Sequence, residues 1–131
     1  MKRRVLLADD EPAILATLGE VLGQHGFDVL TVSSATSAIE ALSAEPFDAV
    51  VTDLHMETET AGYRVVEAAA RQPVLPAIIL VSGYPDLAYE WRRRGAHAYF
   101  EKPTPLSTLV ETIEKLLLRL PAEPRTRGKT A

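Results

Sequence analysis

The chain has 131 residues, of which 47% are hydrophobic and 24% are charged, and its formal net charge is −4. This length fits one domain with a single core, and this composition is typical of a globular protein and excludes a disordered chain. The absence of cysteine excludes a disulfide scaffold, a thiolate metal site and a cysteine nucleophile.

The N-terminal part of the chain alternates between short apolar runs and helical spacing. Val5–Ala8 is the first predicted strand, and apolar residues recur at helical spacing over residues 14–22, with Asp10 as a candidate N-cap. Val29–Val32 is the second predicted strand. Ser34 follows it and is placed to cap a second helix. The pattern therefore begins as strand, helix, strand, helix.

The rest of the chain continues this alternation with three more strands and three more helices. The last helix has the clearest signal, because seven apolar residues lie along one side of it and a proline follows its end. In chain order, the elements are strand Ala49–Thr52, a helix from about Gly62 to Ala70, strand Ile78–Val81, a helix from about Asp86 to Arg94, strand Ala98–Phe100, and a helix from Pro105 to Leu120 that Pro121 stops.

Five strands alternating with five helices predict an α/β fold, with right-handed crossovers and a parallel sheet covered on both faces. Strands that read as continuous apolar runs agree with burial of both faces. The flavodoxin-like, doubly wound order 2-1-3-4-5 is the common solution for five strands. It places a crevice beyond the carboxyl ends of strands 1 and 3, and we expect the functional site there.

The C-terminal segment differs from the rest of the chain in composition. Residues 121–131 lack bulky apolar side chains and carry a local charge of +2, which leaves −6 on the remainder. We expect one domain over residues 1–120 and a disordered basic tail over 121–131. The acidic body disfavours direct binding of nucleic acid. No apolar run approaches the roughly 20 residues of a membrane span or forms a secretory signal, so a cytoplasmic protein is expected.

Three carboxylates follow the strands that flank the predicted crevice. Asp9 and Asp10 come directly after the first strand, and Asp53 follows the third. Like charges this close raise one another's pKa or recruit a cation, and an all-oxygen cluster suits a hard ion such as Mg²⁺. The plainer alternative is that Asp10 only caps a helix and Asp53 is a solvated loop residue. We favour a Mg²⁺ site, because all three carboxylates are expected at one edge of the sheet.

A hydroxyl and an ammonium group are expected at the same edge. Ser82 ends the fourth strand, and Lys102 follows the fifth, directly before Pro103. A carboxylate can accept a phosphoryl group, whose oxygens then need a cation, a hydroxyl and a positive side chain around them. Taken alone, Ser82 also fits the start of a turn and Lys102 a surface charge.

Together these residues resemble the signature of response-regulator receiver domains, the CheY-like switches of two-component signal transduction. The resemblance covers residues 4 to about 120 and is carried by Asp9-Asp10, Asp53, Ser82, Tyr99 and Lys102-Pro103. It implies that a sensor histidine kinase or a phosphotransfer protein donates a phosphoryl group to Asp53, with Mg²⁺ as the cofactor. It also implies a phosphoacceptor switch rather than an enzyme, with at most self-catalysed phosphorylation and dephosphorylation.

The resemblance implies a role for each position. Lys102 would contact the phosphoryl oxygens, Ser82 would move toward them, and Tyr99 would turn inward in response. The bond between Lys102 and Pro103 is expected to be cis. Output would pass through the face of helix 4, strand 5 and helix 5 to an unknown downstream protein, with a monomer or weak dimer formed through that face. The implied metal ligands are Asp9, Asp10, Asp53 and the backbone carbonyl of His55.

The loop after Asp53 departs from the family pattern. The family usually has proline where Glu57 stands, and it reaches its glycine one residue earlier than Gly62. We hypothesise that Glu57 and Glu59 modify the cation affinity or the lifetime of the phosphoryl group. This altered loop leaves open a second function, that of a receiver-like interaction module that works without phosphorylation.

Two other functions fit the sequence less well. A Mg²⁺-dependent phosphatase that uses Asp53 as a transient nucleophile would need a cap or substrate pocket, and the chain has no insertion large enough for one. A nucleotide binder would need a glycine-rich loop after the first strand, which is absent.

His25, His55 and His97 have no ligand-like spacing and are expected to be structural. Trp91 fits core packing and a partner surface equally well. We expect either a single-domain regulator or the receiver part of a larger protein.

Overall fold

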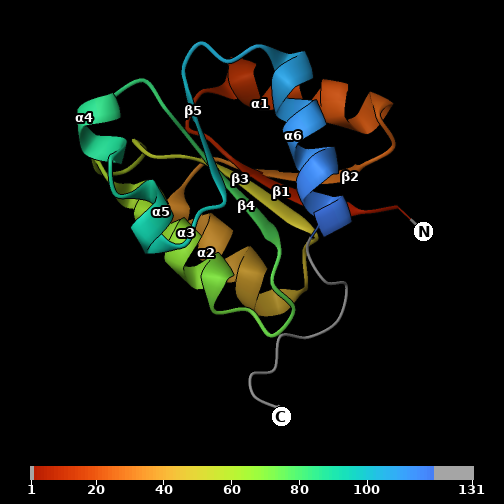
Figure 1. Ribbon diagram of the computed structural model, residues 1–131, viewed down its shortest axis with the longest axis horizontal. Coiled ribbons are helices and arrows are strands. Elements are labelled where there is room, and N and C mark those ends of the chain that lie inside the picture. Colours follow the sequence, from red (N-terminus) through yellow and green to blue (C-terminus); the bar gives the residue numbers. More distant parts are fainter. Residues whose placement is uncertain (1, 120–131) are drawn as a thin grey trace.

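The structure, a computed structural model, describes residues 2–119, in which strands and helices alternate (Figure 1). In chain order, the elements are β1 (Arg4–Ala8), α1 (Pro12–Gln24), β2 (Asp28–Val32), α2 (Ala35–Ala44), β3 (Ala49–Asp53), α3 (Ala61–Ala70), β4 (Ala77–Ser82), α4 (Pro85–Ala88), α5 (Trp91–Arg94), β5 (Ala98–Glu101) and α6 (Leu106–Arg119). The strands form one parallel sheet in the order β2-β1-β3-β4-β5. The predicted flavodoxin-like fold is therefore confirmed.

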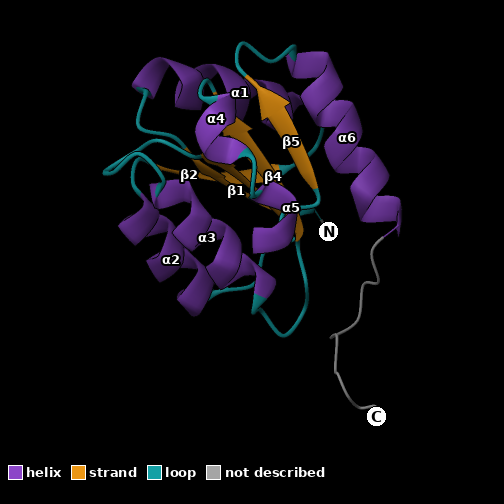
Figure 2. Ribbon diagram, turned by 60° about the vertical axis from the view of Figure 1, so that its left-hand side comes forward, coloured by secondary structure: helices purple, strands orange, loops and turns teal. Residues whose placement is uncertain are grey.

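Helices cover both faces of the sheet. Figure 2 shows α1 and α6 on one side of the strands and α2 and α3 on the other. Successive residues of a strand point to opposite faces, so Leu6 and Val50 pack in the core under α2 and α3, whereas Leu7 and Val51 pack under α1 and α6. Each of these four side chains is at most 1% exposed. Burial on both faces explains why the strands read as continuous apolar runs.

The strand register brings the carboxyl ends of the strands to one edge. Ala8 pairs with Thr52, so the residue after β1 and the residue that ends β3 are neighbours. Asp53 pairs with Val81 of β4, and Ser82 pairs with Glu101 of β5. The carboxyl ends of four adjacent strands therefore meet at this edge, because parallel strands all end in the same direction.

The two predicted helix caps have different outcomes. Ser34 is the N-cap of α2, and its side chain accepts a hydrogen bond from the backbone N–H of Ser37, so this cap is confirmed. The prediction that Asp10 caps α1 is wrong. That helix begins after Glu11, without a side-chain cap, and the backbone N–H of Glu11 donates to Oδ1 of Asp9 at 2.9 Å. Asp9 thus fixes the turn into the helix, and Asp10 stays free for other partners.

The helix predicted over residues 86–94 is also wrong, because two helices of four residues each occupy this segment. The hydroxyl of Tyr63 in α3 donates to the backbone carbonyl of Leu87 at 2.6 Å and accepts from the backbone N–H of Glu90 at 3.2 Å. Both groups would otherwise belong to the hydrogen-bond ladder of one helix, and a side chain inserted there breaks it. The described residues therefore form six helices rather than five.

The last helix follows the prediction over the described residues. Leu109, Val110 and Ile113 are buried against the sheet, and α6 is described to Arg119. The predicted stop at Pro121 and the predicted disordered basic tail lie outside the described residues. None of the helices within residues 2–119 has the length and apolar character needed to cross a membrane.

Candidate functional site

The three predicted carboxylates lie together at the carboxyl edge of the sheet. Asp9, Asp10 and Asp53 each offer an oxygen atom, and these atoms all lie within 4.8 Å of one another. The side chains of Asp9 and Asp53 are buried, and Asp10 is exposed. Three carboxylate oxygens at this spacing form a donor set that suits a hard divalent cation such as Mg²⁺. The cluster fits the predicted metal site in both chemistry and position.

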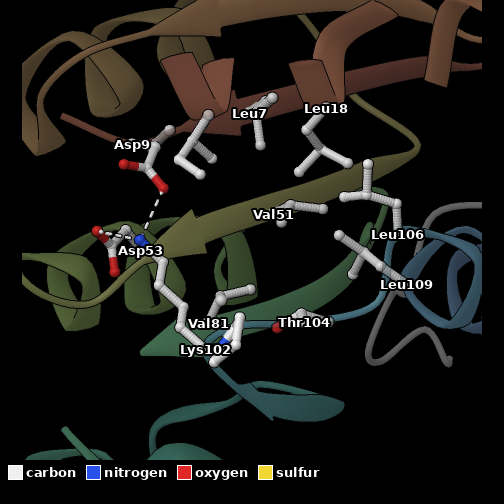
Figure 3. A pocket seen from close by; sticks show the side chains of 13 residues that line it. Leu7, Asp9, Leu18, Val51, Asp53, Val81, Lys102, Thr104, Leu106 and Leu109 are labelled. Carbon is white, nitrogen blue, oxygen red and sulfur yellow. Dashed lines mark hydrogen bonds and ion pairs between the residues drawn. The ribbon is translucent and has the colours of Figure 1, made fainter. Parts of the chain in front are cut away.

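Lys102 reaches this cluster from the end of β5. Its Nζ lies 3.1 Å from Oδ2 of Asp9 and 3.2 Å from Oδ2 of Asp53. Figure 3 marks these contacts with dashed lines. The bond between Lys102 and Pro103 is cis, as the resemblance to receiver domains implies. The same ammonium group lies 3.2 Å from Oε1 of Glu11. Glu11 was not predicted as a site residue, although it directly follows Asp9-Asp10 as a third acidic residue.

Burial and like charges change the acidity of the site. The pKa of Asp53 is raised from an ordinary 3.8 to about 6, because burial disfavours its charge and Asp9 repels it, against the opposing pull of Lys102. Burial lowers the pKa of Lys102, but the carboxylates of Asp53 and Asp9 raise it more, so the pKa stays above its usual value. Lys102 is therefore an ammonium group at neutral pH. A cation bound among the carboxylates would favour the ionised form of Asp53.

Ser82 and Tyr99 lie beside each other next to this cluster. Ser82 is fully buried at the end of β4, and its Oγ accepts a hydrogen bond from the backbone N–H of Tyr84 at 2.9 Å. The hydroxyl of Tyr99 donates to the backbone carbonyl of Ser82 at 3.5 Å. The half-buried ring of Tyr99 stacks on Trp91 of α5, with 6.3 Å between the ring centroids. The structure thus links the end of β4 to β5 and α5.

Two cavities meet at Asp53 and Lys102, which line both of them. A polar cavity of about 360 Å³ lies over the carboxylates. It is lined by His55 and Tyr84, whose ring centroids lie 5.5 Å apart. An apolar cavity of about 390 Å³ lies between the sheet, α1 and α6 (Figure 3). Ile14 lines it, which explains why this residue of the predicted apolar face of α1 is 37% exposed. The polar cavity gives a small charged group access to the carboxylates.

The loop between β3 and α3 is packed closely against the site. The backbone N–H of Leu54 donates to the carbonyl of Val81 at 3.0 Å, and that of Gly62 donates to the carbonyl of Leu54 at 2.8 Å. A Cβ at Gly62 would lie 2.1 Å from the backbone oxygen of Asp53. Only glycine fits there, so the glycine of the altered loop is set by the approach of α3 to the end of β3.

The three histidines lie in different environments. At the end of α1, Nδ1 of His25 lies 2.9 Å from the carbonyl oxygen of Val21, and Nδ1 of His97 accepts a hydrogen bond from the backbone N–H of Ile78 at 2.9 Å. These contacts fit the structural roles that the sequence indicates. His55 is the exception, because it lines the polar cavity over Asp53.

The chain is similar to known receiver domains in sequence. It matches the family described as the response regulator receiver domain over residues 5–114. It is 31% identical over 115 residues to the transcriptional regulatory protein GlrR of Escherichia coli (strain K12). The matched region covers 86% of this chain and 26% of that protein. The chain therefore spans about a quarter of the length of this curated relative.

Solved structures resemble the chain as well. A response regulator receiver protein from Sinorhizobium medicae WSM419 is 33% identical, with a TM-score of 0.79 over 89% of this chain and 95% of that one. The receiver domain of the sensor histidine kinase PA1611 from Pseudomonas aeruginosa PAO1, solved with a magnesium ion in its active-site cleft, is 20% identical, with a TM-score of 0.76 over 89% and 98%. The family match spans most of the chain, and the sheet has the strand order that the sequence predicts. This chain belongs to the response regulator receiver domain family of two-component systems.

Proposed function

We propose that this domain is a phosphoacceptor switch, in which Asp53 accepts a phosphoryl group from a sensor histidine kinase or a phosphotransfer protein. The observation that supports this most strongly is the convergence of three carboxylates and one lysine under a polar cavity. A structural ion pair would need one carboxylate for one lysine. The extra acidic groups make sense if a cation and a phosphoryl group share the site.

Asp53 and Lys102 have different roles in the proposed phosphoryl transfer. Lys102 holds Oδ2 of Asp53 at 3.2 Å, so we assign the other oxygen, Oδ1, as the nucleophile. It attacks the phosphorus of a phosphohistidine, the P–N bond breaks, the imidazole leaves, and Asp53 becomes an acyl phosphate. Lys102 then contacts the phosphoryl oxygens and offsets part of the added charge.

The carboxylates would also hold a divalent cation. The ligands of Mg²⁺ would be Asp9, Asp10, Asp53 and the backbone carbonyl of His55, and the ion would neutralise part of the phosphoryl charge. The magnesium ion in the cleft of the PA1611 receiver domain supports this at the level of the shared fold. The domain would act as a switch rather than an enzyme, and at most would catalyse its own phosphorylation and dephosphorylation.

We further propose that the signal leaves through the face formed by α4, α5, β5 and α6, toward a downstream protein. A phosphoryl group beside Ser82 adds nearly two negative charges and new acceptor oxygens. The hydroxyl of Ser82 would leave the N–H of Tyr84 to donate to one of these oxygens. Tyr99, which contacts the carbonyl of the same serine and stacks on Trp91, would respond by turning inward. The shift is a change in population between two conformations.

Intact-mass measurement tests the phosphoacceptor. Wild type and Asp53→Asn are incubated with acetyl phosphate and Mg²⁺. Wild type should gain the mass of one phosphoryl group, the variant should gain none, and a chelator should abolish the gain. An equal gain in Asp53→Asn would exclude Asp53 as the acceptor. A wild type that gains nothing would instead favour an interaction module that works without phosphorylation.

The assigned role of Tyr99 has a separate test. Tyr99→Ala should gain the phosphoryl group as wild type does, because the side chain of Tyr99 contacts the carbonyl of Ser82 and the ring of Trp91 rather than the phosphoacceptor. It should lose the effect of phosphorylation on hydrogen exchange in α4, α5 and β5, and with it the dependence of partner binding on phosphorylation. Equal loss of phosphorylation and of its effect on exchange would contradict this role.

A further inference from the structure

We propose that Glu57 is a positioning residue for the phosphoacceptor site, because its carboxylate ties the loop after Asp53 to the N-terminus of α2 and so holds His55 in the wall of the polar cavity. The inference rests on the proposed function of Asp53. It concerns the loop that departs from the family pattern.

The contacts of Glu57 join two segments that are far apart in sequence. Its Oε1 accepts a hydrogen bond from the backbone N–H of Ala35 at 2.8 Å. Its Oε2 accepts from the backbone N–H of Thr36 at 3.0 Å and from the hydroxyl of Thr36 at 3.2 Å. The first N–H groups of a helix have no partner within the helix, and a carboxylate is favoured there by its charge. Both carboxylate oxygens are therefore committed to α2.

Glu57 lies outside the acidic cluster of Asp9, Asp10 and Asp53, because both of its carboxylate oxygens contact the N-terminus of α2. Any effect of Glu57 on a bound cation therefore has to be transmitted through the loop.

The segment between Asp53 and Glu57 is short, so the contacts of Glu57 can affect the position of His55. Between Asp53 and Glu57, Leu54 is fully buried and Met56 is 6% exposed. The backbone N–H of Met56 donates to the carbonyl of Thr58 at 3.0 Å. His55 lies between these two anchored residues and lines the polar cavity. Release of Glu57 would free the outer end of this segment, and the backbone of His55 would lose a fixed position over Asp53.

The chain offers two matched controls. Glu59 lies in the same loop and is exposed, and within residues 2–119 its side chain makes no hydrogen bond or ion pair, so Glu59→Gln removes the same charge without a tether. Ser34 caps the same helix through the N–H of Ser37, so Ser34→Ala weakens α2 without touching the loop. The first control isolates charge, and the second isolates the stability of the helix.

The experiment is an NMR titration of the full chain with Mg²⁺, which needs no phosphorylation, together with urea unfolding in a chelator. Glu57→Ala should bind Mg²⁺ about tenfold more weakly, as loss of a residue that supports metal ligands commonly does. Glu57→Gln, which keeps one acceptor, should lie between this variant and wild type. Glu59→Gln should match wild type, and Ser34→Ala should lower stability with unchanged Mg²⁺ affinity.

Two results would overturn the inference. One is a Glu57→Ala variant that loses stability but binds Mg²⁺ as wild type does, and the other is a Ser34→Ala variant with an equal loss of affinity. Failure of the proposed function would look different. In that case wild type would not gain a phosphoryl group from acetyl phosphate, whatever the four variants do in the Mg²⁺ titration.

Discussion

The carboxylate edge of the sheet and the α4–α5 segment are built in different ways. At the edge, Asp9 follows one buried strand and Asp53 ends another, and a lysine directly after the last strand pairs with both. The α4–α5 segment consists of two helices of four residues, too short to be stable on their own. The register of the strands positions the carboxylates and Lys102, whereas a few side-chain contacts hold α4 and α5 in place. A segment held in this way can move at little cost, which suits a face that changes on phosphorylation.

The contacts that hold α4 and α5 illustrate this difference. Arg94 pairs with Glu67 of α3 at 2.9 Å and with Glu90 at 2.8 Å, and its guanidinium lies 4.3 Å from the ring centroid of Tyr63. Exposed ion pairs and cation–π contacts are individually weak, because water and salt screen them. The hydroxyl of Tyr63 adds two hydrogen bonds to the same segment. Three predictions test whether the two regions differ as this comparison requires.

The largest expected effect is at the carboxylate edge. Gly62→Ala would place a methyl group 2.1 Å from the backbone oxygen of Asp53, a contact that neither backbone segment can relieve by rotating a side chain. We expect a loss of about 3 kcal/mol in the free energy of unfolding, measured with urea. In the control Gly23→Ala, the added Cβ meets nothing within 4 Å. That variant should keep or gain stability, and similar losses in both would refute the steric reason.

A second effect concerns the charge of Asp53 in metal-free protein. The folded state raises the pKa of Asp53 to about 6, so it binds this proton more tightly than the unfolded chain does. The contribution of this group to stability is therefore present below about pH 4 and is lost as the pH rises through about 6. In a chelator, Asp53→Asn should be more stable than wild type at neutral pH by about 2 kcal/mol, and this difference should shrink toward pH 4.

Urea unfolding of both proteins at several pH values measures this difference. Mg²⁺ should then stabilise wild type more than the variant, because the cation favours the ionised carboxylate. A difference in stability that does not change between pH 4 and 7 would contradict the raised pKa.

The smallest expected effect is at the α4–α5 segment. Tyr63→Phe keeps the ring beneath Arg94 but removes the hydroxyl that contacts Leu87 and Glu90. We expect the free energy of local opening of α4 and α5 to fall by about 1 kcal/mol. Hydrogen exchange should become faster in these two helices and stay unchanged elsewhere. Phosphorylation by acetyl phosphate should be unchanged. Tyr89→Phe, at a residue that is 76% exposed, is the control. Equal exchange in both variants would show that the hydroxyl of Tyr63 does not hold the segment.

Much of the site could be predicted from the sequence, because it depends on where strands end. Asp9, Asp10, Asp53 and Lys102 come together once five apolar runs are assigned to a parallel sheet in its common order. Glu11 was missed, since its contact with Lys102 depends on how the turn after β1 bends toward the site. The roles of these residues in phosphoryl transfer stay predictions.

The sequence by itself determined the alternation of strands and helices, the residues that stand at the carboxyl ends of the strands and the identity of the family, because periodicity and strand ends are local properties. Only the tertiary structure decided that Tyr63 breaks the predicted helix over residues 86–94 and that Glu57 holds α2. Each of these contacts joins residues more than 20 positions apart, and no local pattern records which distant backbone group a side chain will reach. Such contacts exist only after the sheet has brought their elements together.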